Sequence, residues 1–349
     1  MSEQDVTVPA ADESARVEQV SKPAQTKRGG LLKGATGRNL GLVIALLALC
    51  IFGVITAGER FASIDNLLTI LRLASIFGVI SIGMTFVITG GGIDLSVGSV
   101  IGLSSVWAST LATQTMAQDF HWIIIVLCAL GVGLAAGVIN GVLIAYGKVV
   151  AFIATLAMLV AARGLAELIG NKQTLIVNDN GFKGFFRSDL FGIDPLIIIF
   201  AVVALIGWFL LTRTTFGRRT VAVGGNYEAS RLAGLKVKRH TVALYVLAGT
   251  AAGIAGFMIM GRTGVGTSTH GTLYELDAIA AVVVGGTLLI GGRGTIVGTV
   301  LGVLIFTTLT NVFTQNNLDT SVQAITKGFI IVVAVLLQQR FATRDSSST

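Results

Sequence analysis

Long apolar stretches recur along this chain and leave little room for any fold except a bundle of membrane helices. A helix needs about 20 apolar residues to cross the roughly 30 Å of hydrocarbon in a bilayer. Nine runs of about that length occur, at residues 40–57, 67–89, 97–113, 122–146, 149–169, 195–211, 242–260, 295–313 and 321–337, and a shorter one at 278–290. We therefore predict an all-α polytopic membrane protein with about ten transmembrane helices.

The composition excludes a soluble globular domain. Of the 349 residues, 53% are hydrophobic and only 12% are charged, and the mean hydropathy is +0.82. So few charges cannot cover so much apolar surface in water. Cys50 and Cys128 fall inside predicted spans, and the three histidines are scattered. Neither pattern has the spacing of metal ligands, so we predict no metal site and no cofactor.

A glycine-rich segment occurs twice. Residues 91–102 read GGIDLSVGSVIG and residues 291–302 read GGRGTIVGTVLG, with the same residue at six of twelve positions. Each copy lies where one apolar run ends and another begins, which is typical of broken helices at matching places in the two halves of a transporter. The pair predicts a weak internal repeat and a translocation path or gate. The candidate residues for the path or gate are Gly91, Gly92, Asp94, Ser96, Gly291 and Gly292.

Most of the 44 glycines need no such role. Many are spaced by four, as are Gly133, Gly137 and Gly141 on one apolar run and Gly249 and Gly253 on another. Small residues at this spacing let membrane helices approach closely. We expect these glycines to be packing positions.

Basic residues predict how the chain is oriented in the membrane. Residues 213–240 carry seven Lys or Arg against a single Glu, whereas residues 171–194 balance three bases with three acids. The positive-inside rule places the first loop in the cytoplasm and the second outside. It also makes both termini cytoplasmic, with a disordered tail over 1–39, a membrane domain over 40–338 and a short tail over 339–349. The net charge of +7 is then a topology signal, with no nucleic-acid partner.

A short helix is predicted over residues 226–234, inside the basic loop. Asn226 suits the N-cap, Glu228 suits the first turn, and Gly234 can adopt the left-handed conformation that ends a helix. About two turns of helix are unstable alone in water, so a docked partner would supply the missing burial. An interfacial loop held by anionic membrane lipid is an equally open alternative. The predicted contact residues are Asn226, Tyr227, Glu228, Ala229, Arg231, Leu232 and Gly234.

The charged residues favour an energy source outside this chain. Those within the apolar region lie near predicted helix ends, where carboxylates stay wet and long side chains reach the interface. They are Arg72, Arg163, Glu167, Glu275 and Asp277. None forms the mid-membrane relay that an ion-driven carrier needs. Asp94 aligns with Gly294 in the second copy, and we expect it to cap the helix that begins near Ser96.

Enzymatic chemistry is not predicted. The chain has no GxxxxGK[ST] loop that would cradle a nucleotide phosphate. Its dispersed histidines assemble no convincing set of nucleophile and base. We therefore do not expect this chain to be an enzyme.

Several ordered motifs carry a family resemblance. They are GGIDLSVGS at 91–99, AFIATL at 151–156 with Arg163-Gly164, FGRR at 216–219, GGN at 224–226 continuing to Gly234, YELDAIAA at 274–281, GGT at 285–287 and Lys327-Gly328. With them the chain resembles, from Phe61 to about Leu337, the membrane permease subunits of bacterial ATP-binding-cassette importers for monosaccharides, the ribose-type sugar permeases.

The resemblance implies an assembly in the bacterial cytoplasmic (inner) membrane. Two permease subunits, as a homodimer, would form the sugar path, a separate cytoplasmic ATP-binding subunit would drive it, and an extracytoplasmic solute-binding protein would deliver the sugar. Residues 226–234 would be the coupling helix that seats in the ATP-binding subunit, which favours docking over the lipid alternative. An ion-coupled secondary sugar transporter and a passive channel are the rival functions.

One position departs from the pattern of the family. Leu273 stands where family members usually carry glycine, just before the Tyr-Glu-Leu-Asp run. The loop is predicted to face outward, so docking of the binding protein or the outer gate is expected to differ here.

Overall fold

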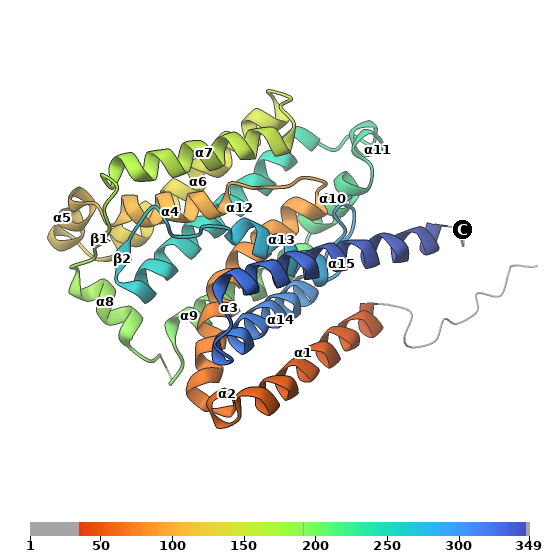
Figure 1. Ribbon diagram of the computed structural model, residues 1–349. Coiled ribbons are helices and arrows are strands. Elements are labelled where there is room, and N and C mark those ends of the chain that lie inside the picture. The colour runs from red at the N-terminus through yellow and green to blue at the C-terminus, as the bar shows by residue number, and fades with distance from the viewer. Residues whose placement is uncertain (1–34, 191, 347–349) are drawn as a thin grey trace, which may run out of the picture.

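The computed structural model describes residues 35–190 and 192–346, and nearly all of its regular structure is helical (Figure 1). The long helices are α1 (Ala35–Ala57), α3 (Ile64–Thr89), α6 (Ile123–Ala145), α7 (Ala151–Ile169), α9 (Pro195–Arg213), α12 (Val237–Thr263), α14 (Ile296–Gln315) and α15 (Thr320–Ser346). The shorter ones are α2 (Glu59–Ala62), α4 (Val97–Ala108), α5 (Leu111–Asp119), α8 (Asn180–Arg187), α10 (Thr215–Gly225), α11 (Tyr227–Leu232) and α13 (Tyr274–Val284). The predicted all-α class is confirmed, apart from one antiparallel pair of two-residue strands, β1 (Leu175–Ile176) and β2 (Val265–Gly266).

Within the described residues, seven helices are long and apolar enough to cross a membrane, so the chain is a multi-pass membrane protein. They are α1, α3, α6, α7, α9, α12 and α14. Three further predicted spans are occupied by α4, α13 and α15. The number of ten crossings therefore stays a prediction.

Two of the predicted spans have the wrong bounds. The span expected over 97–113 stops at Ala108, because Thr110 accepts a hydrogen bond from the amide of Thr113 and starts the separate helix α5. With 12 residues, α4 is about 18 Å long, too short to cross a bilayer. The run expected over 278–290 is helical only over Tyr274–Val284, before the paired glycines Gly285 and Gly286.

Helices α3, α12 and α14 form the buried centre of the bundle, and α1 lies at its edge with most side chains exposed. The most extensive helix pair is α6 with α12. Gly133 and Gly137 on α6 face Gly249 and Gly253 on α12 so closely that a Cβ on Gly133 would lie 2.7 Å from the amide nitrogen of Gly253. The predicted packing role of these glycines is confirmed.

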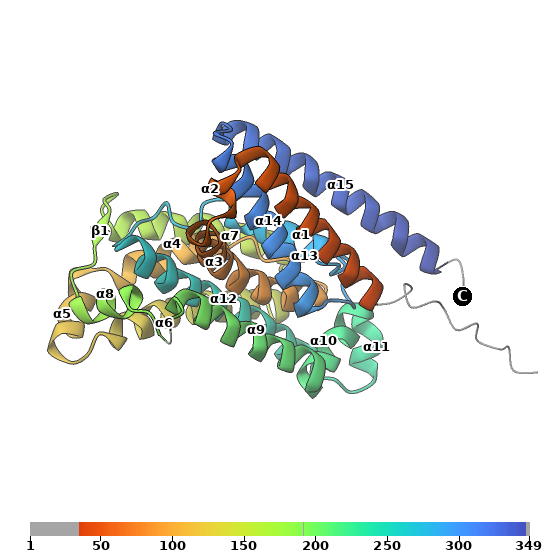
Figure 2. The same cartoon turned by 90° about the horizontal axis from the view of Figure 1, so that it is seen from below.

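The two ends of the bundle differ. Helices α10 and α11, the start of α1 and the end of α15 lie at one end, which we call the α11 end (Figures 1 and 2). Helices α5 and α8 and the strand pair lie at the other, the α8 end. There, Trp122 stacks on Phe185 with ring centroids 5.2 Å apart and holds α8 against the start of α6. Aromatic side chains of this kind commonly mark a membrane–water interface.

The predicted tails lie mostly outside the described residues. Residues 1–34 and 347–349 are not described. Residues 35–39, within the predicted tail, belong to α1, and residues 339–346 continue α15 without a break. The helices thus extend beyond the apolar runs at both ends, and the bounds of the membrane domain at residues 40 and 338 stay a prediction.

Candidate functional site: the exposed helix and the glycine junction

The predicted short helix exists as α11. The side-chain oxygen of Asn226 accepts a hydrogen bond of 2.9 Å from the amide of Ala229, which is N-cap geometry. Glu228 lies in the first turn and pairs with Arg231 at 2.9 Å. Gly234 has φ +83°, and the amides of Gly234 and Leu235 donate to the carbonyls of Arg231 and Ser230, which closes the helix in a Schellman motif. The predicted caps are therefore confirmed, over six helical residues.

The outer surface of α11 is available to a partner. The side chains of Glu228 and Arg231 are 65% and 59% exposed, and the apolar Leu232 is 77% exposed. Tyr227 is also exposed, at the start of the helix. An apolar side chain so exposed on a six-residue helix lacks burial that a docked protein can supply.

A second helix, α10, precedes α11 and was not predicted. Thr214 caps it by accepting a hydrogen bond from the amide of Gly217. Only Asn226 separates α10 from α11, and its amide still donates to the carbonyl of Ala222 on α10 at 3.0 Å. The two helices therefore form one elbow. The signal in the sequence is Thr214, which suits an N-cap, followed by the buried residues Gly217, Thr220 and Val223 at a spacing of three.

The two glycine-rich segments meet each other. The amide of Gly292 donates a 2.8 Å hydrogen bond to the carbonyl of Thr89, the last residue of α3. Gly291 lies against Gly91 so that an added Cβ would be 2.9 Å from the Gly91 Cα. Gly91, Gly291 and Gly292 all have positive φ, between +77° and +89°, a conformation that glycine adopts without steric cost.

The end of α10 closes on both segments. A Cβ on Gly224 would collide with the carbonyl oxygen of Thr89 and lie 2.6 Å from the amide nitrogen of Gly292. Main-chain atoms from the end of α3, from the end of α10 and from the two glycine segments are therefore in direct contact. We call this contact of Thr89, Gly91, Gly224, Gly291 and Gly292 the glycine junction. The sequence predicted the two glycine segments but not that α10 lies on them.

Polar side chains anchor the first segment in the bundle. The Asp94 carboxylate accepts from the amide and hydroxyl of Ser96 at 2.9 and 2.6 Å. Asn140 on α6 donates to the Ser96 hydroxyl at 2.9 Å, and Tyr245 on α12 donates to the carbonyl of Ile93 at 3.3 Å. Asp94 lies just before α4, as expected, but it holds Ser96 in place rather than capping the amides of the first turn.

The second segment is held in two ways: Thr299, at the start of α14, bonds to the hydroxyl of Thr85 on α3 at 2.7 Å, and the loop 285–295 before α14 has hydrogen bonds within its own main chain. Leu288 donates to the carbonyl of Arg293, and Gly291 donates to the carbonyl of Leu288, each at 3.0 Å. Gly294 occupies the position of Asp94, so the charge is missing here. Ile290, at the tip of the segment, is 80% exposed. The two copies therefore share a left-handed first glycine, Gly91 and Gly291, and differ in the side chains that tie them to the bundle.

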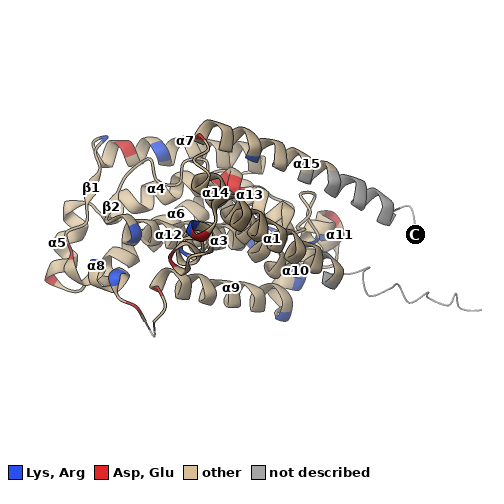
Figure 3. Cartoon of the chain, turned by 60° about the horizontal axis from the view of Figure 1, so that its bottom comes forward, with Lys and Arg blue, Asp and Glu red and all other residues tan. Residues whose placement is uncertain are grey.

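Some charged residues expected at wet helix ends are buried in the middle of the bundle. Glu275 is 8% exposed, in the first turn of α13 and against Gly98 of α4. The guanidinium of Arg163 donates to the carbonyl of His270 at 3.0 Å. The expectation of a wet Glu275 is wrong because α13 begins inside the bundle, where Figure 3 shows acidic positions away from either end.

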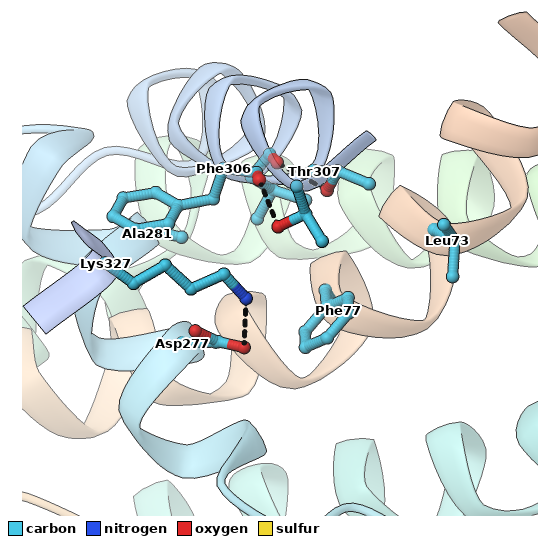
Figure 4. Close-up of a pocket in the computed structure, with 9 residues that line it drawn as sticks. Leu73, Phe77, Asp277, Ala281, Phe306, Thr307 and Lys327 are labelled. Atoms are coloured by element: carbon cyan, nitrogen blue, oxygen red, sulfur yellow. Dashed lines mark hydrogen bonds and ion pairs between the residues drawn. The ribbon is translucent and has the colours of Figure 1, made fainter. Parts of the chain in front are cut away.

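Asp277 and Lys327 join α13 to α15. Their charged atoms are 3.3 Å apart, and each side chain is 21% exposed. Figure 4 shows the pair beside a small cavity of about 60 Å³ walled mainly by apolar side chains. The same figure places Phe77 of α3 and Phe306 of α14 around it. The negative charge of Asp277 is thus balanced by Lys327 inside the bundle, with little contact with water.

The described residues hold no group of three or more His, Cys, Asp or Glu side chains that could bind a metal ion. Cys50 and Cys128 are free and partly buried on separate helices.

Comparisons with known proteins show which proteins the chain is similar to. A protein family described as "Branched-chain amino acid transport system / permease component" matches residues 66–336. The ribose import permease protein of Bacillus subtilis is 41% identical over 306 residues, which cover 87% of this chain and 92% of that protein. The galactose/methyl galactoside import permease protein of Haemophilus influenzae is 33% identical, covering 84% of this chain and 92% of that protein. The xylose transport system permease protein of Escherichia coli is 30% identical, covering 93% and 99%.

No solved structure gave a significant match. The family match covers most of the chain, and the relatives align over nearly their whole length. The chain therefore belongs to this family of membrane permease components, together with the bacterial sugar import permeases.

Proposed function

We propose that this protein is the transmembrane subunit of an ATP-binding-cassette importer for a monosaccharide in the bacterial inner membrane. Two copies would form the path, a solute-binding protein would deliver the sugar, and a separate ATP-binding subunit would supply the energy. Relatives named for ribose, galactose and xylose support a sugar as the substrate. As import permeases, they favour this function over an ion-coupled carrier.

The observation that carries the proposal is α11, a capped, exposed helix at the basic end of the bundle. The α11 end carries Arg219, Arg231, Lys236 and Lys238 close to one another, which supports a cytoplasmic location. Both termini would then also be cytoplasmic, and the α8 end would face the solute-binding protein. Residues 226–234 would be the coupling helix, with Leu232 as its apolar contact.

Anionic membrane lipid is proposed as a second partner of the same face. Lys238 lies over the ring of Tyr146 at 5.5 Å, and Lys236 and Arg239 line shallow pockets beside α11. Lysine and arginine near the cytoplasmic surface attract lipid phosphates. They would hold the loop at the interface while α11 itself projects to the ATP-binding subunit.

The proposal is tested by uptake of labelled ribose, galactose and xylose into vesicles that contain the chain with its ATP-binding subunit and solute-binding protein. Uptake should require ATP and survive collapse of the proton and sodium gradients. Glu228→Lys and Gly234→Pro should abolish uptake and co-purification of the ATP-binding subunit, because they change the charge and the end of α11.

The matched control is Asp119→Lys, an equal charge change at the exposed end of α5. It should leave co-purification of the ATP-binding subunit unchanged. Normal co-purification and uptake with Glu228→Lys and Gly234→Pro would show that α11 is not the coupling helix. Uptake that follows an ion gradient without ATP would favour the secondary transporter.

A further inference from the structure

We propose that the glycine junction is an inner gate, with the loop 285–295 between α13 and α14, which carries Gly291 and Gly292, as its moving part and the end of α10 as its latch. Gly224 is then a positioning residue for transport. The inference rests on the proposed function, since α11 must receive the movement from the ATP-binding subunit. It goes beyond that function by naming the contact through which the movement reaches the membrane bundle.

The two glycine segments are unequal, and this decides which one moves. Asp94, Ser96, Asn140 and Tyr245 tie the first segment to α6 and α12, the most extensively packed pair of helices. In the second segment Gly294 stands where the first has the charged anchor Asp94, and the Gly292 amide bonds to the Thr89 carbonyl at the end of α3. The start of α14 is held on α3 by the 2.7 Å hydrogen bond between the hydroxyls of Thr299 and Thr85. The loop 285–295 before it can therefore separate from Thr89 and the first segment while α14 stays in place.

This loop, residues 285–295, is also shaped to move as a flap. Gly286, Gly291 and Gly292 have φ of +89°, +89° and +77°, so its turns can rearrange with little steric penalty. The exposed tip at Ile290 projects away from the bundle. The helix α13, which precedes this loop, is joined to α15 by the ion pair of Asp277 and Lys327. A hinge at the end of α13 would thus leave α13 itself in place.

Gly224 connects this flap to α11. It lies two residues before Asn226, on the last turn of α10, and its Cα has no room for a side chain between Thr89 and Gly292. Because Asn226 bonds to both helices, α10 and α11 move as one elbow. A displacement of α11 would therefore lift Gly224 from both segments together. Packed contacts of this kind switch between discrete arrangements rather than stretch.

The neighbouring Gly225 provides a matched control. A Cβ on Gly225 would lie 4.0 Å from the Gly292 Cα, an ordinary contact distance, whereas a Cβ on Gly224 would overlap the Thr89 carbonyl. Gly224→Ala should hold the junction apart. It should lower ATP-dependent uptake by about 10-fold or more while the ATP-binding subunit still co-purifies and hydrolyses ATP at about the native rate. Gly225→Ala should retain native uptake and hydrolysis.

A second measurement reports on the gate directly. Thr89 is fully buried at the junction, so Thr89→Cys, made with Cys50→Ser and Cys128→Ser, should react slowly with a membrane-impermeant maleimide when the gate is closed. In the complete complex, labelling should differ by about threefold or more between the ATP-bound and nucleotide-free states. Adding Gly224→Ala should make labelling fast in both states, and adding Gly225→Ala should not.

The inference is overturned if Gly224→Ala transports normally, if Gly225→Ala is equally impaired, or if labelling of Thr89→Cys is the same in both nucleotide states. The comparison of labelling between the two nucleotide states tests the gate even if Gly224→Ala fails to fold, because the Thr89→Cys variant retains Gly224. Failure of the proposed function looks different, since Glu228→Lys would then still bind the ATP-binding subunit whatever the gate does.

Discussion

The amide of Gly292 donates a hydrogen bond of 2.8 Å to the carbonyl of Thr89 at the end of α3, and beside it Gly291 lies against Gly91, so the two copies of the glycine repeat meet main chain to main chain. Each copy lies between two helices and runs into the second of them, α3 and α4 for the first and α13 and α14 for the second. The two breaks between helices therefore lie side by side in the bundle. They contact Gly224 at the end of α10, next to α11, the exposed helix that we propose binds the ATP-binding subunit.

Asp94 should matter for the position of Ser96 rather than for ion transport. Asp94→Ala removes the acceptor of two hydrogen bonds and should lower the free energy of unfolding by about 1–3 kcal/mol. Asp94→Asn keeps an acceptor oxygen and should cost less, with most uptake retained. Thermal unfolding in detergent and uptake in vesicles measure both. If Asp94→Asn is stable yet inactive, the negative charge itself takes part in transport.

The ion pair of Asp277 and Lys327 should stabilise the contact of α15 with α13. Asp277→Asn leaves the lysine unpaired among apolar side chains, and Lys327→Gln leaves the carboxylate unpaired, so each should lower the melting temperature. The double variant should recover part of the loss, with a coupling energy of about 1–2 kcal/mol. Additive effects in the double variant would show that the two charges do not interact.

Leu273 adopts a left-handed conformation, φ +65°, immediately before α13. For a residue with a side chain this costs about 1 kcal/mol relative to glycine. Leu273→Gly should therefore raise the melting temperature, although it removes an apolar side chain that is 57% exposed. Leu276→Gly, one turn later within α13, should lower it. Equal losses at both positions would mean that the backbone at Leu273 is not strained.

His270 lies in the loop between β2 and α13. Burial, together with the positive charge of Arg163, lowers its pKa to about 4 from the ordinary 6.5. The folded protein thus binds fewer protons than the unfolded chain below pH 6.5, so stability should fall as the pH is lowered from about 6.5 to about 4. His270→Asn, whose side-chain amide takes the position of the Nδ1 atom that bonds to the Ser105 hydroxyl, should reduce that loss. Melting temperatures across this pH range test it, with exposed His121→Asn as the control.

The features that the sequence predicts best are local. The caps of α11 depend on Asn226 and Gly234, whose preferences act within a few residues, and the structure has both as expected. The apolar runs likewise predict most long helices, and the glycine spacing predicts the packing role of the glycines that the structure places between α6 and α12. Before α13, where the family usually carries glycine, Leu273 still adopts the left-handed backbone that suits glycine.

The features that sequence reasoning misses depend on contacts between distant segments. Burial of Glu275 follows from where α13 begins in the bundle, which no pattern near Glu275 reveals. The contact of Gly224 with Thr89 and Gly292 involves main-chain atoms from three parts of the chain. The sequence Gly224-Gly225 does not reveal which of the two glycines lacks room for a side chain. Only the spatial arrangement distinguishes Gly224 from Gly225.

The glycine junction is built from peptide groups, with glycine as the residue that α10 contributes to it. Such a contact has no pocket shape, charge or hydrogen-bonding pattern that could be matched to one sugar and not another. Changes that adapt the protein to a new cargo can therefore accumulate elsewhere without disturbing it. Cargo choice and force transmission are in this way separable properties of the same chain.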